Sequence, residues 1–328
     1  VECYDGVPAP GMLTWTDNCD GTGTVPVPDG LTYAWLDSEG LGDRLLRDTE
    51  ARRLWLVNGF AARLSAAQVK AARAHELVIS HGNGPQVGLL ALQSAAGAPE
   101  QAYPMDILDA ETEGMIGYLI EQELNNLLPP AYRCAVLLTQ IEVDANDPAF
   151  RHPSKPIGPL YDEAQARQLA RERGWAVAPD GERFRRVVAS PRPRRIFELG
   201  VIELLVSQGV IVICAGGGGI PVVCRADGSL VGVEAVIDKD FASALLAREL
   251  RAEAFLMLTD VDAVHSDWAT ASARPIRRAS PAALRELSFA PGSMAPKVEA
   301  ACGFVDQTGA MAAIGRLEDA QAILVSPD

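Results

Sequence analysis

From about residue 62 onward, short apolar runs typical of strands alternate with segments of helical periodicity. This alternation predicts a mainly parallel β-sheet with helices on both faces, that is, an α/β fold of three layers, α/β/α. We expect strands at 77–80, 135–139, 210–215 and 254–258. We expect helices at 66–74, 87–93, 109–127, 196–208 and 241–250.

Two segments depart from this rhythm. Between about residues 142 and 187 the composition turns polar, with Pro, Arg and Gly throughout, which predicts a lid or a small protruding subdomain. Residues 1–57 are crowded with Gly, Pro, Asp and Thr in their first half and lack strand or helix periodicity. We therefore predict a poorly ordered segment at 1–57 and the main domain at 58–328.

Charge and composition exclude several classes of protein. The formal net charge is −14, without a basic stripe that could bind nucleic acid. No run of about 20 uninterrupted apolar residues is present, so we expect no membrane span and a cytoplasmic location. The four histidines are far apart and have no nearby cysteine ligands, so we expect no protein-bound metal site.

The lysines form an unusual set. Of 29 basic residues only four are lysines, and Lys155, Lys239 and Lys297 lie in turns flanked by Pro, Gly or carboxylates. Because the chain otherwise uses arginine, lysine at these three positions indicates that a compact ammonium is needed there rather than a planar guanidinium. Ammonium groups that converge on one anion indicate phosphate chemistry, although three lysines could also remain by chance.

Glycine-rich loops follow two of the predicted strands. They are His81-Gly82-Asn83-Gly84-Pro85 and the tetrad Gly216 to Gly219. Ligands of open α/β sheets bind at the carboxyl ends of strands, where backbone N–H groups and helix N-termini attract anions. The glycines could equally serve a tight turn. With the lysines they predict phosphoryl transfer, yet neither a GxxxxGK[ST] loop nor a kinase GxGxxG loop is present.

Six blocks in this order resemble the carbamate kinases of the amino-acid kinase superfamily. They lie at 76–88, 155–159, 216–222, 232–240, 258–262 and 292–300. The resemblance covers roughly residues 62 to 325. The segment Lys155-Pro-Ile-Gly-Pro159 within a polar insert favours carbamate kinase over acetylglutamate or uridylate kinase.

The resemblance implies reversible phosphoryl transfer between carbamoyl phosphate and ADP, giving ATP and carbamate, with Mg²⁺, in a cytoplasmic homodimer of arginine metabolism. The catalytic residues it implies are Lys155, Lys239, Lys297 and Asp240. The residues implied for substrate and phosphate binding are Gly82, Asn83, Gly84, Gly217 and Gly218. Those implied for nucleotide binding are Asp238, Thr259, Asp260, Val261 and Met294.

One family feature is missing, and it keeps other functions open. The family begins with a strand that runs into a Gly-Gly-Asn phosphate loop, and no Gly-Gly-Asn is present here. The chain could be an impaired enzyme or a pseudokinase that binds nucleotide without turnover. It could also be a superfamily kinase that acts on another carboxylate or on a phosphonate. Thr259-Asp260 could cap a turn, and His81 could be a packing histidine.

Overall fold

The computed structural model describes residues 76–96, 102–268, 270, 272–289, 294–320 and 323, together with four two-residue strands nearer the N-terminus. The chain divides into two compact units, Val1–Ala51 and Arg52–Asp328. In the first unit, β1 (Thr16–Asp17) pairs antiparallel with β2 (Gly23–Thr24). In the second, β3 (Leu54–Trp55) pairs antiparallel with β4 (Ala61–Ala62).

Parallel pairing predominates among the central strands of the second unit. One sheet has the order β5 (Val78–Ile79), β12 (Val210–Ile213), β6 (Arg133–Val136), with both ladders parallel. A second has the order β11 (Pro193–Ile196), β7 (Gln140–Val143), β13 (Ile220–Cys224), β14 (Leu230–Gly232), in which β7 and β13 are parallel. A third pairs β15 (Ala254–Thr259) in parallel with β18 (Met311–Arg316).

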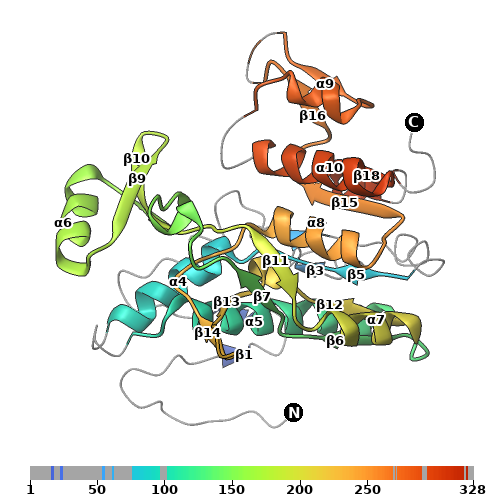
Figure 1. Ribbon diagram of the computed structural model, residues 1–328, viewed down its shortest axis with the longest axis horizontal. Coiled ribbons are helices and arrows are strands. Elements are labelled where there is room, and N and C mark those ends of the chain that lie inside the picture. Colours follow the sequence, from blue (N-terminus) through green and yellow to red (C-terminus); the bar gives the residue numbers. More distant parts are fainter. Residues whose placement is uncertain are drawn as a thin grey trace. The chain divides into compact units, whose positions relative to one another are not determined.

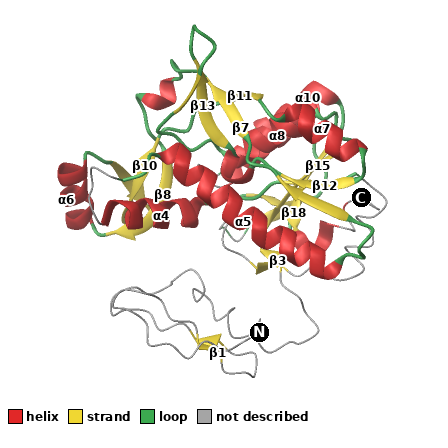
Figure 2. Ribbon diagram, turned by 90° about the horizontal axis from the view of Figure 1, so that it is seen from below, coloured by secondary structure: helices red, strands yellow, loops and turns green. Residues whose placement is uncertain are grey.

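Helices cover both faces of β12. On one face α5 (Met105–Leu127) packs Ile116 and Ile120 against Ile211 and Ile213, and Figure 2 shows this helix from below. On the other face α7 (Leu199–Ser207) and α8 (Lys239–Glu249) contribute Ile202, Leu245 and Leu246 to a cluster with Val210 and Val212. Successive side chains of a strand point to opposite faces, so this fully apolar strand needs cover on both. The predicted three-layer α/β/α fold is thereby confirmed.

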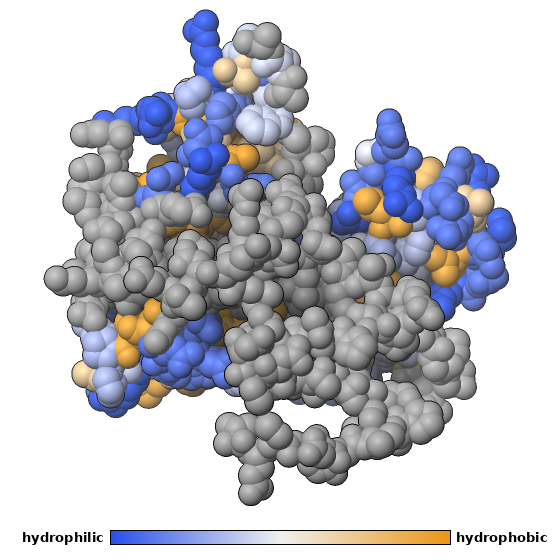
Figure 3. All heavy atoms as spheres, turned by 180° about the vertical axis from the view of Figure 1, so that it is seen from behind, coloured by the Kyte–Doolittle hydropathy of each residue, from blue (hydrophilic) through white to orange (hydrophobic). Residues whose placement is uncertain are grey.

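A small antiparallel subdomain projects from these layers (Figure 1). Its strands are β8 (Lys155–Tyr161), β10 (Arg183–Val188) and β9 (Ala176–Asp180), in that order, with α6 (Glu163–Arg173) beside them. Asp162 and Gln165 form a capping box at the start of α6, and Gly174 ends the helix with a φ of 66°. Seen from behind, its surface is mainly hydrophilic with scattered apolar residues (Figure 3).

In the C-terminal part of the second unit, helix α10 (Met294–Thr308) covers the parallel pair β15 and β18. It packs on β15, where the rings of Phe304 and Phe255 meet edge to face with centroids 5.5 Å apart. A hairpin of β16 (Val264–Ser266) and β17 (Arg274–Ile276) and the short helix α9 (Pro281–Arg285) follow β15 in the chain.

Several boundaries differ from the sequence prediction. The helix expected at 196–208 begins only at Leu199, because β11 pairs with β7 as far as Ile196. The polar excursion expected from about 142 begins after β7, which ends at Val143. α5 starts at Met105 rather than 109. The expected helix at 66–74 and most of 1–57 lie outside the described residues. In the part that the structure describes, the helices are too short or too polar to cross a bilayer.

Candidate active site

The three lysines singled out in the sequence meet around the start of α8. Asp238 is the N-cap of this helix, and its side chain accepts a hydrogen bond from the Asp240 N–H at 2.9 Å. Lys155 Nζ, at the start of β8, donates to Asp238 Oδ2 at 2.6 Å. Lys297 Nζ, in the first turn of α10, donates to both carboxylate oxygens of Asp240 at 3.0 and 3.1 Å. Lys239 lies between the two carboxylates in sequence.

The electrostatics of this cluster favour an anion. The pKa of Lys239 is lowered to about 7, mainly by burial and also by the Lys297 ammonium, while Asp240 opposes the shift. For Asp238, burial alone would raise the pKa, but the Lys155 ammonium, the Asp240 N–H and the Lys297 ammonium together outweigh it and the pKa is lowered. When all three amines are protonated, the cluster has one more positive charge than its two carboxylates balance. A negatively charged ligand would balance that charge and would hold Lys239 in its protonated form.

The loop at 81–84 joins β5 to α4 (Gly84–Ala96). Asn83 is buried, and its side-chain amide donates to Asp109 Oδ1 at 3.0 Å and to Thr112 Oγ1 at 2.9 Å. Gly84 begins the helix, and a Cβ added there would meet nothing within 4 Å. The first N–H groups of a helix have no acceptor within the helix, so this open end suits an anion. His81 is buried with its pKa lowered to about 4 by burial, so it is a neutral packing residue.

The glycine tetrad, which includes the short 3-10 helix η3 (Gly216–Gly218), is buried in the protein. A Cβ would lie 2.2 Å from His81 Nε2 at Gly216, 2.2 Å from Asn83 Nδ2 at Gly217 and 2.2 Å from the Ile237 carbonyl at Gly218. No side chain fits at these three positions.

The N–H groups of the tetrad already have acceptors in the protein. Gly216 donates to Glu113 Oε1, Gly217 to the His81 carbonyl, Gly218 to the Ala215 carbonyl and Gly219 to the Gly216 carbonyl. This differs from the open nest of N–H donors expected from the sequence, and it accounts for the glycines by close packing. The roles of Gly217 and Gly218 in phosphate binding stay predictions.

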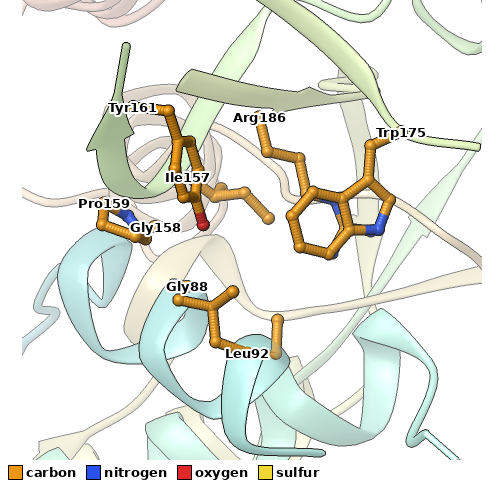
Figure 4. Close-up of a pocket in the computed structure, with 9 residues that line it drawn as sticks. Gly88, Leu92, Ile157, Gly158, Pro159, Tyr161, Trp175 and Arg186 are labelled. Carbon is orange, nitrogen blue, oxygen red and sulfur yellow. The ribbon is translucent and has the colours of Figure 1, made fainter. Parts of the chain in front are cut away.

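The protruding subdomain contacts α4 backbone to backbone. A Cβ on Gly88 would lie 2.0 Å from the Gly158 nitrogen, and Gly158 has a φ of 72°. Beside this contact lies a small cavity of about 10 Å³, bounded by Tyr161, Trp175 and Arg186 among others (Figure 4). The Arg186 guanidinium stacks over Trp175 at 4.5 Å from the ring centroid. The close contact of Gly158 with Gly88 holds β8, and with it Lys155, against α4 of the main domain.

The residues predicted for nucleotide binding lie at three element ends. Thr259 ends β15, and its hydroxyl donates to Asp260 Oδ1 at 2.9 Å; Asp260 is exposed. Val261 is half-buried, and Met294 is the first residue of α10. Asp238, also predicted to contact nucleotide, forms an ion pair with Lys155. The nucleotide-binding roles of this group stay predictions.

Sequence reasoning missed three buried polar residues on α5: Asp109, Thr112 and Glu113. Burial raises the pKa of Glu113 to about 8, and it raises the pKa of Asp109 well above its usual range. Polar residues in a helix usually face solvent, so residue type alone does not predict that these three side chains are buried. The signal available in the sequence was their spacing, since positions i, i+3 and i+4 share a face with the buried Leu108, Ile116 and Ile120.

The fold and the cluster of amines around α8 together define the class of protein. The chain belongs to the amino acid kinase family, whose sequence model matches residues 40–314. The resemblance inferred from the sequence blocks is therefore confirmed.

Within this family the chain is similar to carbamate kinases. It is 55% identical over 252 residues to the carbamate kinase of Rhizobium meliloti (strain 1021), which covers 76% of this chain and 78% of that protein. It is 57% identical over 245 residues to the carbamate kinase of Haemophilus influenzae, covering 75% of this chain and 79% of that one. The solved carbamate kinase from Giardia lamblia bound to AMP-PNP superposes with a TM-score of 0.70 at 38% identity, covering 79% and 86% of the two chains.

Proposed function

We propose that this chain is a carbamate kinase, which transfers a phosphoryl group reversibly between carbamoyl phosphate and ADP and forms ATP and carbamate. The observation that carries the proposal is the gathering of Lys155, Lys239 and Lys297 around Asp238 and Asp240. Catalysis of phosphoryl transfer depends mainly on positioning and on stabilising the charge of the transferring group. Curated relatives at more than half identity carry this name.

Each residue of the cluster has its own role in the proposed phosphoryl transfer. Lys239 and Lys297 stabilise the negative charge that builds on the equatorial oxygens of the transferring phosphoryl group. Asp240 holds the Lys297 ammonium in place through both of its oxygens. Lys155 reaches the same region from the subdomain, and Asp238 holds it there. Asn83 and Gly84 present the open end of α4 to the carbamoyl group.

We infer that the nucleotide binds with Mg²⁺. Asp238 and Asp240 are both engaged by lysines, and the described residues contain no group of three His, Cys, Asp or Glu side chains that could hold a metal. These residues fit an ion held mainly by phosphate oxygens and water, and Asp260 is an exposed carboxylate among the residues predicted for nucleotide binding. Bound Mg²⁺ would neutralise phosphate charge on the nucleotide.

We infer a homodimer in the cytoplasm. Three apolar side chains on α5, Ile107, Met115 and Tyr118, are exposed, as is Leu138 beyond β6. An exposed cluster of this kind on a water-soluble helix suits the contact between two copies of a chain.

The direct test is turnover by the purified full-length protein. We expect ATP to form from ADP, Mg²⁺ and carbamoyl phosphate, measured by a coupled luminescence assay, and we expect Lys297→Met to abolish it. Calorimetry with AMP-PNP separates the alternatives. Nucleotide binding without ATP formation would favour a pseudokinase, and ATP formation only from another acyl phosphate or from a phosphorylated phosphonate would favour a different superfamily kinase.

A further inference from the structure

Helix α5 directs three polar side chains into the protein interior. Asp109, Thr112 and Glu113 are 1%, 0% and 1% exposed, and they share one face of the helix. Buried polar groups are stable only when they are hydrogen-bonded, so the partners of this face show what it holds. For Glu113 both partners are backbone donors: Thr139 N–H to Oε2 at 3.1 Å and Gly216 N–H to Oε1 at 2.9 Å.

The two N–H groups come from turns at the ends of different strands. Thr139 follows β6 and precedes β7, and Gly216 follows β12. The Thr139 hydroxyl closes the arrangement, because it accepts from the Ala215 N–H at 2.9 Å. Ala215 has a φ of 52°, an unfavourable conformation for a residue with a side chain. The Glu113 carboxyl group and the Thr139 hydroxyl together hold this strained turn.

The same turn is in contact with the loop at 81–84. Gly217 N–H donates to the His81 carbonyl at 2.8 Å, and a Cβ on Gly216 would meet His81. Four residues earlier on α5, Asp109 holds the side chain of Asn83. One helix therefore fixes both glycine-rich loops relative to each other.

We propose that Glu113 is a positioning residue of the phosphoryl-transfer site, which acts by holding the glycine tetrad in register with the His81–Gly84 loop. The inference rests on the proposed function for what the site does, and on the geometry alone for what Glu113 holds. Glu113 is buried and both of its oxygens accept from backbone N–H groups, so we assign it a positioning role rather than a catalytic one. A carboxyl group suits this place because each of its two oxygens accepts from one of these N–H groups, whereas a glutamine would direct its own NH₂ group at one of them.

The test compares Glu113→Gln and Glu113→Ala with Glu111→Gln, the same amide substitution at an exposed glutamate of the same helix. We expect amide hydrogen exchange at Thr139 and Gly216 to accelerate in both Glu113 variants. We expect kcat to fall by about 10- to 100-fold, more in the alanine variant, with KM for ADP within about twofold, because small misplacements in a positioned site reduce the rate steeply. Glu111→Gln should match wild type in all three measurements.

Two results would overturn the inference. One is unchanged amide protection at Thr139 and Gly216 in both variants. The other is a lowered melting temperature with an unchanged kcat at a temperature where the variant is folded, since that marks a purely structural role. If the wild-type protein makes no ATP, the proposed function fails, and amide exchange in the same three variants still decides whether Glu113 holds the two turns.

Discussion

Lys239 is a partly buried lysine whose surroundings favour the neutral amine. Its neighbours in sequence, Asp238 and Asp240, are each bonded to another lysine. The site thus brings three amines and two carboxylates together in space around the N-terminus of α8. Such a balance is sensitive to the shape of each cation as well as to its charge, because a compact ammonium and a forked guanidinium do not occupy the same space.

Replacing Lys239 by arginine keeps the charge and changes the shape. We expect Lys239→Arg to reduce kcat by about 100-fold or more, comparable to the loss of one donor to a transition-state oxyanion. The matched control is Arg248→Lys, the reverse change at an exposed position of the same helix, where Arg248 pairs with Glu249. Steady-state kinetics check both variants. Near-normal turnover of Lys239→Arg would contradict a role as a point charge.

The lowered pKa of Lys239 makes a prediction about stability against pH. Its pKa is about 7 in the folded protein and 10.5 in the unfolded chain. Between these values the unfolded chain binds the proton and the folded protein does not, so the free energy of unfolding rises with pH across this window. Lys239→Met lacks this contribution.

Denaturant unfolding of wild type and Lys239→Met at about pH 7 and about pH 9.5 measures the effect, because other titrating groups largely cancel in the difference. We expect the difference in unfolding free energy to shift in favour of wild type as pH rises. A difference that stays constant with pH would show that Lys239 is protonated in the folded protein throughout.

At the scale of elements, the contact between α4 and β8 positions Lys155. This contact involves no long side chain at its closest point, because the backbones of Gly88 and Gly158 touch. A helix glycine lowers helix stability, so its presence in the middle of α4 has a packing reason. The subdomain is anchored there and, at the first residue of β8, by the ion pair of Lys155 with Asp238.

Gly88→Ala tests this anchor. We expect kcat/KM for carbamoyl phosphate to fall by about tenfold or more and stability to fall by about 1–3 kcal/mol, because the added Cβ overlaps the Gly158 backbone. The affinity for AMP-PNP should change little. The control is Gly114→Ala on α5, where the nearest atom to the new Cβ is Leu138 Cδ2 at 3.8 Å. That variant should be stabilised by roughly 0.5–1 kcal/mol. Equal behaviour of the two variants would refute the anchor.

At the scale of the whole molecule, the division of the chain into two compact units after Ala51 bears on which part is needed for stability. The two compact units are Val1–Ala51 and Arg52–Asp328, and the residues of the candidate site all lie in the second. The family model matches from residue 40 onward. The second unit carries the parallel sheets, the subdomain and the apolar clusters that surround β12 and β15.

A chain that starts at residue 52 should therefore retain its stability. We expect its melting temperature, measured by calorimetry, to lie within a few degrees of the full-length value, since the core clusters remain complete. A large decrease would show that the first unit contributes to the stability of the second.

Much of the fold could be predicted from the sequence because its signals are local. The apolar run at 210–213 and the Asp-Lys-Asp segment that caps α8 depend on residues a few positions apart. Boundaries were less predictable, as at Ile196, because pairing with a distant strand determines where β11 ends. The first unit and the expected helix at 66–74 are not tested by the described residues.

The sequence by itself determined the alternation of strands and helices, the family, and the choice of lysine at three positions, because periodicity, capping and residue chemistry are properties of neighbouring residues. Only the tertiary structure decided which groups meet. Lys155 and Asp238 are 83 residues apart, and Glu113 and Gly216 are 103 apart. Burial, the pKa values of Lys239 and Glu113 and the exclusion of side chains from the tetrad arise from packing between such distant segments, which no local pattern encodes.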